Sequence, residues 1–124
     1  MKLLLDTHVY LWIRGEPARI SGATREALRD ADRVWVSVAS AWEAEIKVGK
    51  GNLSLGETFA FGIADAGFEL LPVTLDHVER LRDLPMHHKD PFDRMLVAQA
   101  LHEGAILVTV DRHFARYGVK LMAA

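Results

Sequence analysis

Short apolar runs alternate along the chain with longer segments in which apolar residues recur at helical spacing. The runs LLL and ILVTV are apolar almost throughout, which is typical of strands that are covered on both faces of a sheet. On this pattern we predict strands at residues 3–5, 33–37, 68–73, 106–110 and 119–122. Pro72 indicates that the third of these lies at an edge of the sheet or ends there.

The segments between these runs predict helices. Residues 19–31 place Ile20, Ala23 and Ala27 on one side of a helix. Gly49 ends the helix predicted at residues 38–48. Helices are predicted at residues 8–13, 19–31, 38–48, 55–66, 75–84 and 91–102. Strands that alternate with helices indicate an α/β fold with a mostly parallel sheet covered on both faces. No repeat or long linker divides the chain, so we expect one domain over residues 1–124.

Composition narrows the function classes. Half of the residues are hydrophobic and 26% are charged, which is typical of a globular protein. The net charge of −2 excludes a broad basic surface, so any contact with nucleic acid needs a local basic cluster. The absence of cysteine excludes disulfides, thiolate nucleophiles and cysteine-based zinc sites. The apolar run at 3–5 is too short for a signal peptide or membrane span, so we expect a cytoplasmic protein.

Two of the predicted strands end in an aspartate. Asp6 follows residues 3–5, and Asp111 follows residues 106–110. Ligands of open parallel sheets bind beyond the carboxyl ends of the strands, so both carboxylates are expected at that edge. Either residue alone is also well placed to cap the helix or turn that follows it.

A third acid begins the predicted helix at 91–102. Pro91 suits the first helical position, which makes Asp90 the N-cap and places Asp93 one turn into the helix. The following residues, 95–98, are apolar on every side, so this helix is expected to be buried. An enclosed carboxylate at its head needs a cation as partner.

The helix at 38–48 supplies either Glu43 or Glu45 as a fourth acid. Lys47 stands four residues after Glu43, which is also typical of a surface ion pair. Spacing alone does not separate the two glutamates.

Four carboxylates in one pocket repel one another unless a cation neutralises them. Carboxylate ligands favour Mg²⁺ or Mn²⁺ over zinc, and such ions support hydrolysis of phosphodiesters by activating water. His87 and His88 are adjacent and point different ways, so zinc is not favoured there. For His8 and His113, each two residues after an acid, we expect a surface or capping role.

With these motifs assembled, the chain resembles the PIN-domain ribonucleases and, more closely, the VapC-type toxins of bacterial toxin–antitoxin pairs. The matching segments cover most of the chain in the family's order. They are LLLDTHVYLW at 3–12, VSVASAWEAEIKVGKGNL at 36–53, HKDPFDRMLVAQA at 88–100 and LVTVDRHFARYGV at 107–119.

The resemblance implies a PIN-like three-layer α/β/α sandwich with a twisted sheet of about five strands. It implies that Asp6, Glu43, Asp93 and Asp111 form the catalytic, metal-binding site, and it selects Glu43 over Glu45. It also implies an RNA substrate, Mg²⁺ or Mn²⁺ as cofactor, a toxin homodimer and an antitoxin whose C-terminal segment covers the site.

Other residues near these motifs are candidates for supporting roles. Thr7, Asp90 and Thr109 are expected to cap or support the acids, and Lys47, Arg94 and Arg112 are candidates for RNA contact. Large apolar residues are either core residues or a groove for a partner helix; these are Trp12, Trp42, Phe59, Phe61 and Met86.

Two other functions remain as alternatives. A phosphoacceptor receiver domain also places acids at strand ends, but it needs an acceptor aspartate at the end of a central strand, with a threonine and a lysine ending later strands. Here the second predicted strand ends at Ser37 and the third at Pro72, and neither is an acid. A catalytically silent protein-binding module would not need four acids.

Overall fold

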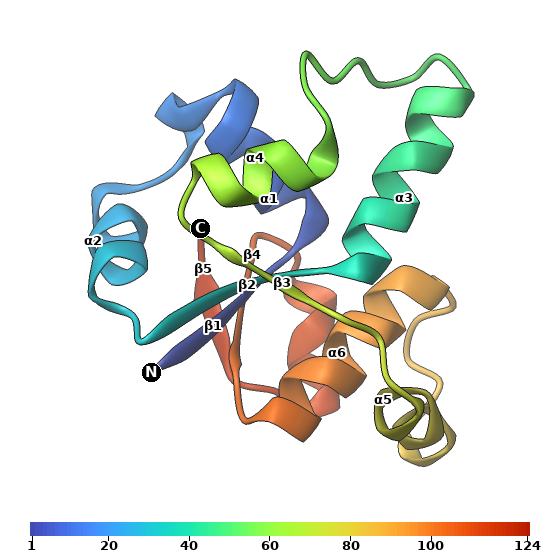
Figure 1. Cartoon of the computed structure of the whole chain (residues 1–124). Helices are drawn as coiled ribbons and strands as arrows, with labels where there is room; N and C mark the ends of the chain where they lie inside the picture. The colour runs from blue at the N-terminus through green and yellow to red at the C-terminus, as the bar shows by residue number, and fades with distance from the viewer.

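The computed structural model describes all of residues 1–124 and contains a five-stranded parallel sheet with the order β3-β2-β1-β4-β5 (Figure 1). Every neighbouring pair of strands is parallel, which confirms the predicted α/β class. The strands are β1 (Lys2–Leu5), β2 (Arg33–Ser37), β3 (Glu69–Leu71), β4 (Ile106–Thr109) and β5 (Leu121–Ala123).

All six predicted helices are present. They are α1 (Thr7–Gly15), α2 (Gly22–Asp30), α3 (Val38–Gly49), α4 (Phe59–Asp65), α5 (Leu75–Arg80) and α6 (Pro91–Glu103). Three short 3₁₀ segments complete the elements: η1 (Pro17–Arg19), η2 (Leu81–Asp83) and η3 (Arg112–Tyr117).

Some predicted boundaries were wrong, and capping explains two of them. Helix α2 begins at Gly22 rather than at residue 19 because the Ser21 hydroxyl accepts the Thr24 N–H. Helix α4 begins at Phe59 rather than at residue 55 because Thr58 caps it in the same way. The predicted third strand is shorter than expected, ends before Pro72, and does lie at the sheet edge.

The two faces of the sheet bury separate apolar clusters. In β1, Leu3 and Leu5 pack on one face with Val9 of α1 and residues of α2, α3 and α4. Leu4 points to the other face, where it packs with Leu96 of α6 and the η3 segment. The sheet and the helices that cover its two faces form a three-layer sandwich, as Figure 1 shows.

The sheet order changes direction beside β1. The chain runs outward from β1 to β2 and β3, and then returns to β4 on the other side of β1. Such a switch point between neighbouring parallel strands opens a crevice at their carboxyl ends. Asp6 follows β1 and Asp111 follows β4, so both acids lie at this crevice. None of the helices combines the length and the apolar character needed to cross a membrane.

Candidate active site

Asp6 is a buried carboxylate at the end of β1. Its residue is 1% exposed, and its backbone N–H donates to the Val108 carbonyl of β4 at 2.9 Å. Asp6 is the N-cap residue of α1, yet its side chain makes no capping bond. Its Oδ2 instead accepts the Thr109 hydroxyl at 2.7 Å. Burial raises the pKa of Asp6, although the Thr109 bond opposes that rise.

Asp111 lies beside Asp6 across the strand pair. Its backbone N–H donates to the Thr109 hydroxyl oxygen at 3.1 Å, so Thr109 links both acids. A carboxylate oxygen of Asp111, one of Asp6 and a ring nitrogen of His8 lie within 4.8 Å of one another. Like Asp6, Asp111 makes no side-chain cap bond to the helical segment after it. The simple capping interpretation is therefore wrong for both side chains.

Asp93 stands at the head of α6, where the predicted cap is confirmed. The Asp90 carboxylate accepts the N–H groups of Phe92 and Asp93 at 2.9 and 3.1 Å. This leaves the Asp93 side chain free, with its Oδ2 at 3.3 Å from His113 Nε2. Burial, followed by the charge of Asp90 and of the other three acids, raises the pKa of Asp93 to about 7.

Glu43 approaches the same acids from α3. Its charge raises the pKa of both Asp6 and Asp93. Its Oε2 lies 3.6 Å from Lys47 Nζ, which is itself 3.4 Å from His8 Nε2. Glu45 lies two residues after Glu43 on the same helix, which turns it about 200° away from Glu43 around the helix axis, and it is exposed. The geometry therefore agrees with the choice of Glu43.

Four segments that are distant in sequence thus bring their carboxylates within electrostatic reach of one another. The ends of β1 and β4 supply two, and helices α3 and α6 supply the others. Thr7 supports this arrangement, because its hydroxyl donates to Ser40 Oγ of α3 at 2.8 Å and ties α1 to α3. A set of carboxylates whose charges raise the pKa of Asp6 and Asp93 has the chemistry of a site for a hard divalent cation.

The sequence interpretation missed two histidines at this site. The rings of His88 and His113 stack with their centroids 4.2 Å apart and flank Asp93. His88 is fixed by the Asp90 N–H, which donates to its Nδ1 at 3.1 Å. Their positions two residues from Asp90 and Asp111 were the only signal in the sequence, and that signal did not show that they meet.

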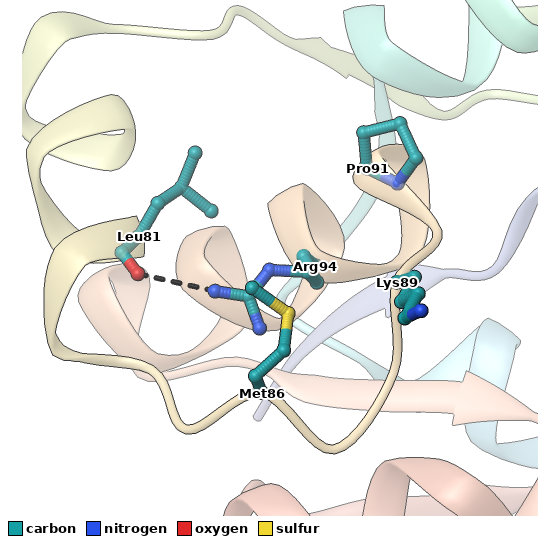
Figure 2. Close-up of a pocket in the computed structure, with 5 residues that line it drawn as sticks. All are labelled: Leu81, Met86, Lys89, Pro91 and Arg94. Carbon is teal, nitrogen blue, oxygen red and sulfur yellow. Dashed lines mark hydrogen bonds between the residues drawn. The ribbon is translucent and has the colours of Figure 1, made fainter.

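The three candidates for RNA contact differ in their surroundings. Lys47 lies at the acids, and Arg112 is exposed. Arg94 instead turns away into the chain, where its guanidinium donates to the carbonyls of Pro85 at 2.9 Å and Leu81 at 3.2 Å. Figure 2 shows the Leu81 bond beside a hollow of about 320 Å³ lined by Leu81, Met86, Lys89, Pro91 and Arg94.

A larger groove, of about 680 Å³, lies beside α1. Its lining includes two residues that also approach the acids: His8, beside Asp6 and Asp111, and Lys47, beside Glu43. Leu11, Trp12 and Leu55 supply apolar lining. It runs between α1 and the loop before α4. The predicted groove residue Trp12 therefore does line a groove, whereas Phe59 is buried in the core.

Comparison with known proteins agrees with this geometry. The sequence model of the PIN domain family matches residues 3–120 of this chain. The chain is 34% identical to Ribonuclease VapC22 of Mycobacterium tuberculosis, with 89% of this chain and 87% of that protein covered.

Two crystal structures of VapBC proteins bound to DNA share the fold. The match to VapBC2 from Rickettsia felis has a TM-score of 0.76 at 17% identity, and it covers 99% of this chain and 98% of the matched chain. VapBC from Salmonella typhimurium has a TM-score of 0.68 at 18% identity, with the same coverage. By its sequence match over nearly the whole length, the chain belongs to the PIN-domain family and is a relative of its VapC ribonucleases.

Proposed function

We propose that this chain is a cytoplasmic, metal-dependent endoribonuclease that acts as the toxin of a toxin–antitoxin pair. The observation that carries the proposal is the gathering of Asp6, Glu43, Asp93 and Asp111 around one crevice. Burial and the charges of the neighbouring acids raise the pKa of Asp93 there to about 7, which is the effect that a bound divalent cation would reverse. A 34% identical ribonuclease supports the choice of RNA as substrate.

The donor set fits Mg²⁺ or Mn²⁺, because all four acids offer hard oxygen ligands. Asp6, Glu43, Asp93 and Asp111 would hold the ion, directly or through water. When bound, the ion supplies an activated water and stabilises the charge that develops on the phosphate.

The protein's own residues prepare the site. The Thr109 hydroxyl fixes the Asp6 carboxylate at 2.7 Å, and Asp90 fixes the backbone around Asp93. Lys47 is the lysine paired with these acids, and it is a candidate to meet the phosphate of the substrate. Arg112 is a further candidate from the exposed surface after β4.

We also propose an antitoxin and a second toxin copy as partners. Solved structures with the same fold include VapBC bound to DNA and a toxin–antitoxin complex from Klebsiella pneumoniae. The groove of about 680 Å³ is lined in part by His8 and Lys47, which approach the acids, so a segment lying in it would come close to them. Leu75 and Val78 of α5 are exposed and offer apolar surface to a second copy.

The sheet order argues against the receiver alternative. Receiver domains have the order 2-1-3-4-5, whereas this sheet has the order β3-β2-β1-β4-β5. The silent-module alternative predicts no binding of Mn²⁺ at millimolar concentration, which calorimetry would test.

The decisive experiment compares cleavage of single-stranded RNA by the wild type and by Asp6→Asn, with Mg²⁺, with Mn²⁺ and with a chelator. We expect cleavage only by the wild type with an ion. Glu43→Gln and Glu45→Gln form a matched pair, of which only the first should lose activity. Full cleavage by a folded Asp6→Asn protein, judged by circular dichroism, would reject the proposal.

A further inference from the structure

Beside the acids lies an aromatic pair that neither the fold nor the metal site explains. Trp42 of α3 directly precedes Glu43, and Phe92 of α6 directly precedes Asp93. Their rings meet edge to face, with centroids 5.1 Å apart and planes at 83°. The two helices that each supply an acid therefore also join through these aromatic neighbours.

Trp42 is much more exposed than packing requires. The residue is 65% exposed, whereas Trp35 is buried in the sheet cluster at 7%. The edge contact with Phe92 orients the indole, and most of the residue stays open to solvent. A large exposed aromatic side chain is typical of a recognition surface, and this one directly precedes a proposed ligand of the ion on the same helix.

The charge of the chain indicates what this surface recognises. A net charge of −2 and an acidic crevice give little electrostatic attraction for a polyanion. A ribonuclease of this kind needs affinity that does not depend on basic residues. Stacking of an unpaired base on an aromatic ring supplies such affinity, and every base has a face that can stack.

Building on the function proposed above, we infer that Trp42, oriented by Phe92, stacks an unpaired base of the RNA next to the phosphate that is cleaved. Trp42 is then a positioning residue: it contacts the substrate's base and sets its register relative to Glu43 and Asp93. A duplex keeps its bases stacked inside, so this contact selects single-stranded RNA or a loop.

The test measures binding separately from cleavage. In an Asp6→Asn background with Mg²⁺, the dissociation constant of a short fluorescein-labelled oligoadenylate is measured by anisotropy for Trp42, Trp42→Phe and Trp42→Leu. We expect Trp42→Leu to weaken binding by about tenfold and Trp42→Phe to weaken it less, since loss of one base–aromatic stack has an effect of this order. Binding of the corresponding duplex should change little.

Phe61→Leu is the matched control. Phe61 is also an exposed aromatic residue, at 56%, but it lies on α4 and not on the helices that carry the acids. We expect oligoadenylate to bind this variant as it binds the parent. Binding should also quench tryptophan fluorescence in the parent, and Trp42→Phe should remove most of that quenching while Trp12 and Trp35 remain.

Several results would overturn the inference. These are unchanged binding by Trp42→Leu, an equal loss for single strand and duplex, or no binding of oligoadenylate by the parent. Sedimentation that finds a wild-type dimer and a Trp42→Leu monomer would do so too, because the ring would then be covered by a second copy. Cleavage by the chain with its wild-type Asp6 separates the two proposals: if it cuts no RNA while binding still depends on Trp42, only the proposed function fails.

Discussion

The two ends of helix α6 carry the same kinds of side chain in opposite circumstances. At the N-terminal end, Asp93 lies with His88 and His113; at the C-terminal end, Glu103 lies with His77 and His102. In each group an acid and two histidines place possible ligand atoms within 4.8 Å of one another. By residue type and spacing alone, either end qualifies as a metal site.

Hydrogen bonds satisfy the C-terminal group. His77 is fully buried, its Nδ1 accepts the Thr74 N–H at 3.0 Å, and its Nε2 lies 2.8 Å from Glu103 Oε2. An imidazole that accepts at Nδ1 and donates at Nε2 has no lone pair left for a metal. This group therefore stabilises the contact between α5 and α6.

The N-terminal group is not satisfied in this way. Asp93 is surrounded by Asp90, Asp6, Glu43 and Asp111, whose charges add to burial in raising its pKa to about 7. Its nearest possible cation is His113, at 3.3 Å. The comparison teaches that unneutralised charge, rather than the presence of acids and histidines, distinguishes the candidate functional site from the structural group.

The largest difference between the two ends should appear in catalysis. Asp93→Asn removes a carboxylate that we propose as a ligand of the ion, so we expect RNA cleavage to fall by about a thousandfold or more, equivalent to several kcal/mol of transition-state stabilisation. Glu103→Gln at the other end is the control and should keep its rate within about threefold, because it lies outside the acidic crevice. Rates are measured under single-turnover conditions with Mn²⁺; equal losses in both variants would remove the distinction.

The sequence was sufficient for much of the N-terminal end. Asp90, Pro91 and Asp93 follow a local capping rule, so their roles depend only on neighbours in the chain. The same is true of Asp6 and Asp111, because a strand that ends in an acid places it at the sheet edge.

The rest depended on contacts over long distances in sequence. The stack of His88 on His113 forms only when η3 folds back toward the loop before α6, and no periodicity encodes that. The satisfied state of His77 depends likewise on Glu103, 26 residues away. Choosing Glu43 over Glu45 required the family resemblance, because both fit the same helix.

The second prediction concerns stability at the C-terminal end. His77→Ala removes a buried ring, its bond to Glu103 and half of the capping box with Thr74, so we expect a loss of about 3 kcal/mol in the free energy of unfolding. Urea denaturation measures this loss. His102→Ala, at a more exposed ring, should cost less than about 1 kcal/mol. RNA cleavage by folded His77→Ala should be unchanged, and a loss of Zn²⁺ or Mn²⁺ binding in this variant would contradict the structural role.

The third prediction uses pH to expose the charge at the N-terminal end. Because the pKa of Asp93 rises from 3.8 to about 7 on folding, the folded chain binds more protons than the unfolded chain between these values. This contribution to stability is fully present below the unfolded pKa and is lost as the pH rises through about 7. With chelator, the urea midpoint should therefore fall from pH 5 to pH 8.

Two additions sharpen that measurement. Asp93→Asn should flatten the decline, because the amide does not titrate. Mn²⁺ should raise the midpoint at pH 8 more than at pH 5, because the ion binds the ionised acids. A wild-type midpoint that rises between pH 5 and pH 8 with chelator would show that the acids do not repel one another as the geometry requires.

The smallest effect is expected beside Asp93, at Arg94. Its guanidinium holds the turn at Leu81 and Pro85 through backbone carbonyls, and it also lies 3.4 Å from the Tyr117 hydroxyl. Arg94→Ala should therefore lower the free energy of unfolding by about 1–2 kcal/mol, since hydrogen bonds from a charged donor have this magnitude. Arg112→Ala, which removes an exposed side chain, should change stability by less than about 0.5 kcal/mol.

Cleavage kinetics then distinguish support of the turn from contact with RNA. If Arg94 only supports the turn, Arg94→Ala keeps its KM for RNA at a temperature where it is fully folded, and the salt dependence of binding does not change. If Arg94 contacts a phosphate, the slope of binding against salt concentration becomes shallower by about one ion. That second result would extend the functional end of α6 to the hollow in Figure 2, because Arg94 lines it together with Lys89.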